Sequence, residues 1–185
     1  MGMVNNALNE IVNSILSCLV LSGWANACNG LGVQLFNGQV VAKEGQHNPD
    51  KTYIGIADNK GTYCYIREGS ALISLSDLNI GSCQNGQAVT VQLRAVGVSN
   101  NPKNTAQNMA DNIYSTLYNC EPTAQSNLFL IDNISISPNT VDTDYHNIFT
   151  SETGQDVRGN LVLAAVDFTL SFDLIGCALP DTKLC

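Results

Sequence analysis

The chain has 185 residues, of which 44% are hydrophobic and only 13% are charged, and its formal net charge is −8. This length and apolar content suffice for one buried core. We therefore predict a single structural domain over residues 1–185, with its core at 4–175 and a C-terminal tail at 176–185. Eight basic residues against sixteen acidic ones argue against a surface that neutralises nucleic-acid phosphates. An acidic wall could still let DNA slide past it, because like charges repel.

The scarcity of charge is unusual, since a typical soluble domain has about 25% charged residues. Asparagine, serine, threonine and glutamine take their place here. One interpretation is that much of the surface contacts other protein, because the centres of interfaces are depleted in charge. The other is a composition typical of the lineage. Both stay open at this point.

The first element in chain order is a helix over Val4–Leu21, because its apolar residues recur at spacings of four, three, four and four. Ala25-Asn26-Ala27 also looks like a signal-peptide cleavage site, but no basic residue precedes Lys43. A helix is therefore favoured over a signal peptide, and the segment is too short and too polar to span a bilayer. The apolar stripe comprises Val4, Leu8, Ile11, Ile15 and Leu19.

Two hairpins are predicted next. In the first, Val33–Phe36 and Gln39–Lys43 flank an Asn-Gly dipeptide, which suits a type I′ turn. In the second, Thr52–Ala57 and Thr62–Arg67 flank Asp58-Asn59-Lys60-Gly61, whose residues are typical of turns. We expect a loop at 24–32 before them.

A strand and a second helix follow. After a predicted loop at Asn79–Gly86, the residues of Ala88–Val98 alternate between apolar and polar, as in a strand with one buried face. Asn104–Cys120 is predicted to be a helix capped by Asn104 or Thr105. Its apolar face comprises Ala106, Met109, Ala110, Ile113 and Leu117.

Two closing strands complete the pattern. Asn127–Ser137 is predicted to be a strand, and Pro138–Gly159 a long polar, acidic loop. In Leu161–Leu174 every even position from Val162 on is apolar, which predicts a strand with one face on the core. The order of elements predicts an α+β fold, in which two helices cover one face of an antiparallel sheet.

The seven cysteines are scattered and form no Cys-x-x-Cys pair, and the chain has only two histidines, so no zinc site is predicted. An odd count argues against a secreted disulfide framework. We expect reduced thiols, mostly buried as small hydrophobic residues, with one or two disulfides as the alternative. The cysteines are Cys18, Cys28, Cys64, Cys83, Cys120, Cys177 and Cys185.

No pattern in the chain predicts catalysis or a cofactor. Asp142-Thr143-Asp144-Tyr145-His146 offers two carboxylates and an imidazole, but it lacks the glycine turn and further oxygens of a calcium loop. Phosphate-binding glycine motifs and nucleophile elbows are missing as well. We therefore expect no metal, no cofactor and no enzymatic activity. A small hydrolase that uses His47 or His146 is the alternative.

A few charges in so charge-poor a chain are candidates for contacts between subunits, because arginine forms bidentate ion pairs with carboxylates. The alternative is that they are exposed charges contributing less than about 1 kcal/mol. Tyr114 and Tyr118 could likewise anchor a partner or flank the core. The candidate interface residues are Arg67, Glu68, Arg94, Asp142, Asp144 and Arg158.

The order of elements over residues 4–175 resembles that of tailed-phage tail terminator and head–tail joining proteins (minor tail protein U-like). The matching segments are 5–21, VTVQLRAVGV at 89–98, NTAQNMADNIYSTLYNC at 104–120 and VLAAVDFTLSFDL at 162–174. The strand material at 33–67 departs from the plainest version of this plan. The resemblance implies an antiparallel sheet with two helices packed on one face and an extended hairpin.

The resemblance also implies a structural role in the virion. Subunits would form a homo-oligomeric ring, commonly sixfold, that caps the tail tube and contacts the neck or connector proteins. DNA would pass through the ring without specific binding, and no membrane is involved. Assembly would take place in the host cytoplasm. Another tail tube or neck ring protein, or a secreted β-rich binding module cleaved after Ala27, is the alternative.

Overall fold

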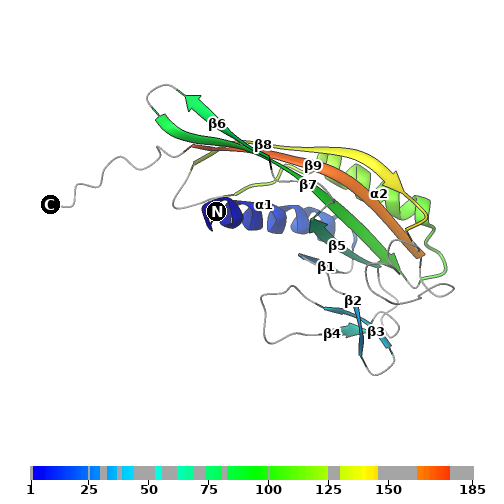
Figure 1. Ribbon diagram of the computed structural model, residues 1–185. Helices are drawn as coiled ribbons and strands as arrows, with labels where there is room; N and C mark the ends of the chain where they lie inside the picture. The colour runs from blue at the N-terminus through cyan, green and yellow to red at the C-terminus, as the bar shows by residue number, and fades with distance from the viewer. Residues whose placement is uncertain are drawn as a thin grey trace.

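The structure is a computed structural model that describes residues 2–24, 26–29, 33–36, 39–43, 53–55, 62–68, 74–80, 83–99, 101–124, 130–145 and 162–175. The larger sheet has the order β1-β5-β7-β9-β8, with β6 also paired to β7, and a smaller sheet has the order β2-β3-β4. Figure 1 shows the long strands curving over α1. The elements are α1 Gly2–Leu21, β1 Asn26–Asn29, β2 Val33–Phe36, β3 Gln39–Lys43, β4 Tyr53–Gly55, β5 Thr62–Glu68, β6 Ser74–Ile80, β7 Cys83–Ser99, α2 Ala106–Asn119, β8 Leu130–Asp142 and β9 Val162–Ile175.

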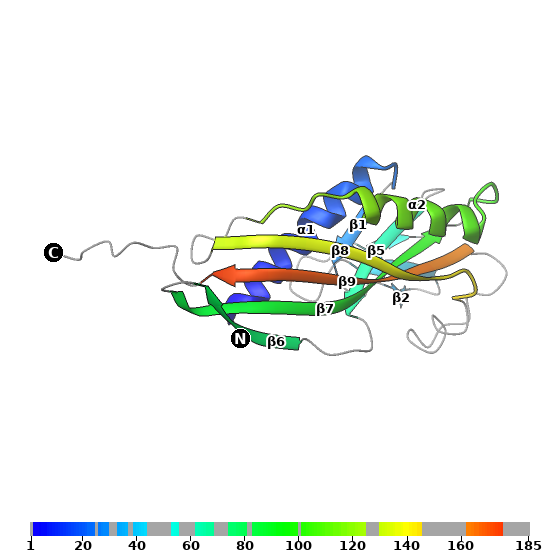
Figure 2. The ribbon, with the colours of Figure 1, turned by 90° about the horizontal axis from the view of Figure 1, so that it is seen from above.

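The centre of the fold is the antiparallel trio β7-β9-β8, on which both helices pack, so the predicted α+β class is confirmed. β7 and β9 pair along their length, from Gln87 opposite Leu174 to Ser99 opposite Val162. Alternate residues of a strand point to the same face, and the predicted apolar face of each strand lies in the core under the helices. Figure 2 shows β6, β7, β9 and β8 side by side, with α2 next to β8.

The predicted N-terminal helix is confirmed, and it belongs to the core. Leu8, Ile11, Ile15 and Leu19 are all buried, together with Trp24 just after the helix. Burying a side chain of this kind stabilises a fold by about 1.5–3 kcal/mol. Cleavage after Ala27 would therefore remove all the core residues that α1 and Trp24 contribute. Among the helices of the described residues, none has the length and apolar character needed to cross a membrane.

The second helix is also confirmed, with a shorter extent than predicted. Thr105 is its N-cap, and the Thr105 side chain accepts a hydrogen bond from the backbone N–H of Asn108 at 3.1 Å. This contact satisfies one of the N–H groups that a helix start leaves unpaired. Met109, Ala110, Ile113 and Leu117 are buried, as the apolar stripe predicts, while Ala106 packs against them partly buried.

The second predicted hairpin is wrong. β4 pairs with β3 in the small sheet, whereas β5 pairs with β1 and β7 in the large one, so the two strands lie in different sheets. The pairing of β1 with β5 is parallel, an exception to the predicted antiparallel sheet. It also places a strand in the segment predicted as a loop at 24–32. Local turn chemistry at Asp58-Asn59-Lys60-Gly61 could not reveal these long-range partners. The first hairpin is confirmed, with Phe36 opposite Gln39.

Two predicted loops are partly strand. Most of Asn79–Gly86 belongs to an extended hairpin of β6 and β7, paired from Ser74 opposite Thr90 to Ile80 opposite Cys83. β8 runs on to Asp142, so the loop predicted at Pro138–Gly159 begins later. Proline is tolerated there because β8 is an edge strand and its register shifts after Pro138. The remainder of that predicted loop, and the predicted tail at 176–185, lie outside the described residues.

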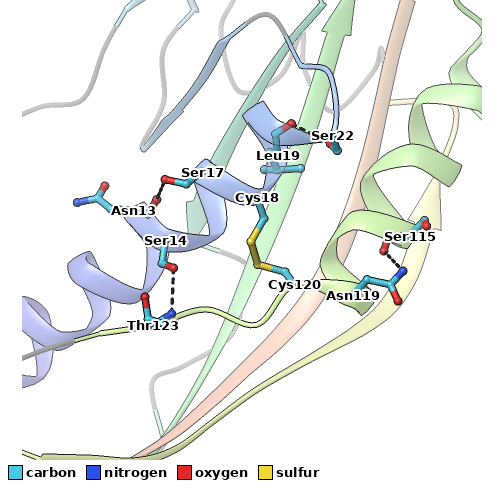
Figure 3. The surroundings of a disulfide bond; sticks show 10 residues. All are labelled: Asn13, Ser14, Ser17, Cys18, Leu19, Ser22, Ser115, Asn119, Cys120 and Thr123. Carbon is cyan, nitrogen blue, oxygen red and sulfur yellow. Dashed lines mark hydrogen bonds between the residues drawn. A yellow bond between two sulfur atoms is a disulfide. The ribbon is translucent and has the colours of Figure 1, made fainter.

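A disulfide joins Cys18 of α1 to Cys120, the C-cap of α2, so the expectation of reduced thiols is wrong for this pair. The two Cα atoms are 6.0 Å apart, a usual separation for such a bond. Next to it, the backbone N–H of Thr123 donates a hydrogen bond to the Ser14 hydroxyl at 2.9 Å (Figure 3). The disulfide and this hydrogen bond fasten the end of α2 to α1. Cys64 is buried, and the other cysteines have side chains outside the described part.

Candidate assembly surface

The face of the β7-β9-β8 sheet that points away from the helices has two parts. At the end where β9 begins it is apolar and buried: Val96, Val98, Leu163 and Ala165 are at most 1% exposed. The aromatic ring of Tyr145 is buried as well. The sheet is therefore covered on both faces at this end, which explains why both odd and even positions of β9 are buried there.

Towards the other end, the same face carries small polar side chains, which we call the hydroxyl face. They form two rows across the three strands. Ser171 lies opposite both Thr90 and Ser135, and Thr169 lies opposite both Gln92 and Ser137. The Thr90 and Ser171 hydroxyls are 3.4 Å apart. The hydroxyl face comprises Thr90, Gln92, Ser135, Ser137, Thr169 and Ser171, all partly or fully exposed.

A charged cluster separates the apolar end from the hydroxyl face. Arg94 donates from Nε to Oδ1 of Asp167 at 2.5 Å and from Nη2 to Oδ2 at 2.9 Å, which is a bidentate ion pair. Thr140 donates to the same Oδ2 at 3.2 Å. The guanidinium carbon of Arg94 lies 5.3 Å from the centroid of the Tyr145 ring, a cation–π distance. The cluster thus ties together β7, β8, β9 and the turn after β8.

The electrostatics of the cluster keep Arg94 charged. The hydrogen bond to Asp167 raises the pKa of Arg94 above its ordinary value, against an opposing effect of partial burial. A raised arginine pKa means that any stability it contributes is present below the unfolded-state pKa and is lost only at extreme alkaline pH. Arg94 therefore acts as a permanent cation, and its charge cannot switch in the physiological range.

The structure brings several of the predicted interface residues to this cluster. Arg67 of β5 lies opposite Arg94 of β7, so two arginines are neighbours in the sheet register. Asp142 ends β8 opposite Ala165, and its Oδ1 accepts a hydrogen bond from the backbone N–H of Asp144 at 2.9 Å. These residues share one region of the sheet although they are far apart in the sequence.

The other two predicted residues lie elsewhere. Glu68 is opposite Leu93, at the next register position of β5. Arg158 lies outside the described residues. The proposed role of these six residues in subunit contacts stays a prediction, and Arg94 has an intramolecular partner in Asp167.

Three members of the cluster are not among the residues predicted from the sequence: Asp167, Tyr145 and Thr140. Asp167 had a detectable signal, because it is a single charge within the apolar stretch Leu163–Leu170, and a buried or half-buried charge in a strand needs a partner. Tyr145 and Thr140 gave no such signal, since both were placed in a loop by their polar surroundings.

Exposed apolar side chains are concentrated on the helices. Leu21 at the end of α1 is 88% exposed, and Tyr118 on α2 is 70% exposed. Tyr114, one turn before Tyr118, is also exposed, as is Val20. Aromatic side chains on a surface are frequent anchors of protein contacts, so this part of the helix layer is the second candidate for a docking surface.

Within the described residues, no group of three or more His, Cys, Asp or Glu side chains is arranged to hold a metal ion. Comparison of the chain with models of known protein families and with curated protein sequences finds no match.

Proposed function

We propose that this protein is a ring-forming structural protein of a tailed-phage virion, a tail terminator or a head–tail joining (neck) subunit. The observation that carries the proposal is the arrangement of elements. An N-terminal helix and a second helix pack on one face of a sheet whose last two strands follow the second helix, with an extended β6–β7 hairpin beside them. The resemblance to tail terminator and head–tail joining proteins implies this same arrangement.

The scarcity of positive charge on the hydroxyl face is consistent with DNA passing the surface without binding to it. The hydroxyl face has no cationic side chain, and Arg94 beside it is neutralised by Asp167, while Arg67 lies opposite Arg94 in the sheet register. The chain as a whole is acidic, with a net charge of −8. A surface of this kind attracts few phosphates, so DNA would pass a ring of such subunits without being held.

The proposed mechanism is steric. Each subunit uses two different patches to contact its neighbours, and the contacts close when the rotation between subunits completes a circle. Six copies is the number that the resemblance implies. One side of the ring would match the tail tube, and the other would contact neck or connector proteins. The candidate contact elements are the β6–β7 hairpin and the exposed Leu21, Tyr114 and Tyr118.

Electron microscopy of the purified chain, alone and mixed with tail tubes, tests the proposal. We expect annular particles with an open centre, or tubes that end in an added disc. Replacing both tyrosines (Tyr114→Ser with Tyr118→Ser) should reduce the number of rings. Ser115→Ala, an exposed position on the same helix, should not. Single subunits in every sample, with tube ends unchanged, would contradict the proposal.

A second candidate function is favoured by the disulfide. Disulfides persist mainly in oxidising compartments, so the Cys18–Cys120 bond fits a secreted or surface β-rich binding module. Cleavage after Ala27 would remove Cys18 and the core residues of α1, so the disulfide favours this module only in an uncleaved form. Native and intact mass of the natural protein separate the two functions: a chain that assembles into a defined oligomer supports the virion protein, and a disulfide-bonded monomer that keeps Cys18 supports the binding module.

A further inference from the structure

A pocket lies between the end of α1 and the first turns of α2, next to the exposed apolar residues of the helix layer. It has a volume of about 180 Å³ and is lined by Ser22, Gly23, Trp24, Met109 and three asparagines. The asparagines are Asn104, Asn108 and Asn112, at positions i, i+4 and i+8. This spacing aligns their side chains along one side of α2 and the turn before it.

The outer amides of this row are held in fixed orientations. Oδ1 of Asn112 accepts the indole N–H of Trp24 at 2.6 Å, so the amide nitrogen of Asn112 keeps its N–H groups for another partner. Nδ2 of Asn104 donates to the hydroxyl of Ser99 at 2.8 Å, and Ser99 is fully buried. The oxygen of Asn104 is therefore left as an acceptor. Asn108, between them, is exposed and offers both a donor and an acceptor.

The rest of the lining is uncharged. Trp24 is 5% exposed and Met109 is 4% exposed, so each contributes a small apolar area at the bottom of the pocket. No acidic or basic side chain lines the pocket. A charged ligand would lose its hydration without gaining a counter-charge, which is unfavourable. The pocket thus selects for a neutral molecule that can both donate and accept hydrogen bonds.

We propose that this pocket binds a single neutral polyhydroxylated unit, such as one sugar residue. A sugar hydroxyl both donates and accepts hydrogen bonds. It can therefore pair with the free N–H groups of Asn112, the free oxygen of Asn104 and either group of Asn108. The C–H groups of a sugar ring suit the apolar floor of Trp24 and Met109. At about 30 Å³ per water the pocket has room for about six water molecules, less than the ~300 Å³ or more of sites for drug-sized ligands. This inference does not depend on the proposed virion role.

The single tryptophan of the chain makes the test specific. Its fluorescence and its indole N–H resonance report on this pocket alone, so the full-length protein is titrated with glucose, galactose, mannose and N-acetylglucosamine in turn. We expect a saturable change with at least one of them. No saturable change at about 10 mM, well above a Kd of about 1 mM, would overturn the proposal.

Asn112→Asp is the decisive variant. It keeps an oxygen to accept the Trp24 N–H but replaces the N–H donors with a second acceptor, so sugar affinity should fall at least tenfold, or about 1.4 kcal/mol. Asn13→Asp, at an exposed site on α1, adds the same charge and should bind like the unmodified chain. Equal affinity in the Asn112→Asp variant would refute the donor role and with it the proposal.

Asn108→Ala distinguishes a loss of sugar binding from a folding defect. Only the backbone N–H of Asn108 takes part in the helix cap, so removal of its exposed side chain should leave thermal unfolding unchanged. The affinity for the sugar should still fall several-fold. An unchanged affinity in this variant as well would leave the pocket without a ligand-binding role and would overturn the proposal.

Discussion

At the scale of single residues, the ring of Trp24 packs directly against the backbone of Gly97. A Cβ atom on Gly97 would lie 2.5 Å from Cη2 and 3.1 Å from Cζ3 of Trp24, and 3.1 Å from Cδ1 of Ile113. Real Cβ atoms essentially never approach another atom as closely as the contact with Cη2, and the two contacts at 3.1 Å are tighter than most. Glycine is therefore needed at position 97 because the indole, positioned by its hydrogen bond to Asn112, presses directly on the sheet.

Gly97→Ala should destabilise the protein by about 1–3 kcal/mol, the usual cost of overpacking a core. The measurement is chemical denaturation of the variant and the unmodified chain. In a Trp24→Phe background the smaller ring leaves room for the methyl group, so the same change should cost clearly less. An equal cost in both backgrounds would show that the contact with Trp24 is not the cause.

The ion pair of Arg94 and Asp167 supports a second prediction at this scale. Their side chains are 21% and 37% exposed, so solvent screens the pair and its net value is modest. Asp167→Ala should still destabilise the protein by about 1–2 kcal/mol, since it leaves the half-buried guanidinium without its charged acceptor. Urea denaturation measures this effect.

Asp173→Ala is the matched control, because Asp173 lies on the same face of β9, opposite Ala88. It should change the free energy of unfolding by no more than about 0.5 kcal/mol. The difference between the two variants should hold between about pH 6 and about pH 9, since Arg94 stays charged throughout. If both aspartate variants are equally stable, the ion pair contributes nothing measurable.

At the scale of elements, the helices are joined by a covalent bond that closes a long segment of chain. Cys18 and Cys120 are 102 residues apart in the sequence. Such a bond restricts the unfolded chain, and a loop of this length corresponds to about 4.7 kcal/mol in the chain-entropy treatment, with 2–4 kcal/mol typical of measured cases.

Reduction should therefore lower the thermal unfolding temperature of the unmodified protein. The Cys18→Ser/Cys120→Ser variant should unfold at the lower temperature with or without reductant. Peptide mapping under non-reducing conditions should recover a linked peptide that contains both cysteines. A variant as stable as the oxidised protein would be inconsistent with a stabilising role for the bond.

The elements also show which features the sequence could predict. Alternation found the buried faces of β7 and β9, and the 3.6-residue period found both helices, because these patterns record burial directly. Pairing between distant strands leaves no such local record. For this reason the local pattern predicts a hairpin of β4 and β5 that does not form, and it does not reveal the first part of β7 or the end of β8.

In the candidate sites as well, the sequence reveals locally patterned features but not contacts between residues that are distant in the chain. Arg94 stood out as a rare charge, but its partner Asp167 is 73 residues away, and only the register of β7 and β9 brings the two together. The disulfide and the Trp24–Asn112 contact are equally long-range. Composition indicated a surface suited to contacts, whereas the identity of the contacts depends on tertiary structure.

At the scale of the whole molecule, the two faces of the sheet differ in chemical character. One face is covered by α1 and α2. The other is apolar and buried at one end and carries mainly hydroxyl and amide groups at the other, with the ion pair of Arg94 and Asp167 between the two parts. Exposed apolar residues are found on the helix layer. This asymmetry gives a subunit distinct surfaces for its neighbours and for a central passage, as a closed ring requires.

Native mass spectrometry of the full-length, oxidised protein over a wide range of concentrations tests the central claim most directly. The account predicts one closed oligomer of defined number, six in the simplest case, that weakens when Tyr114 and Tyr118 are replaced by serine. A monomer at every concentration, in the absence and in the presence of tail tubes, would contradict it.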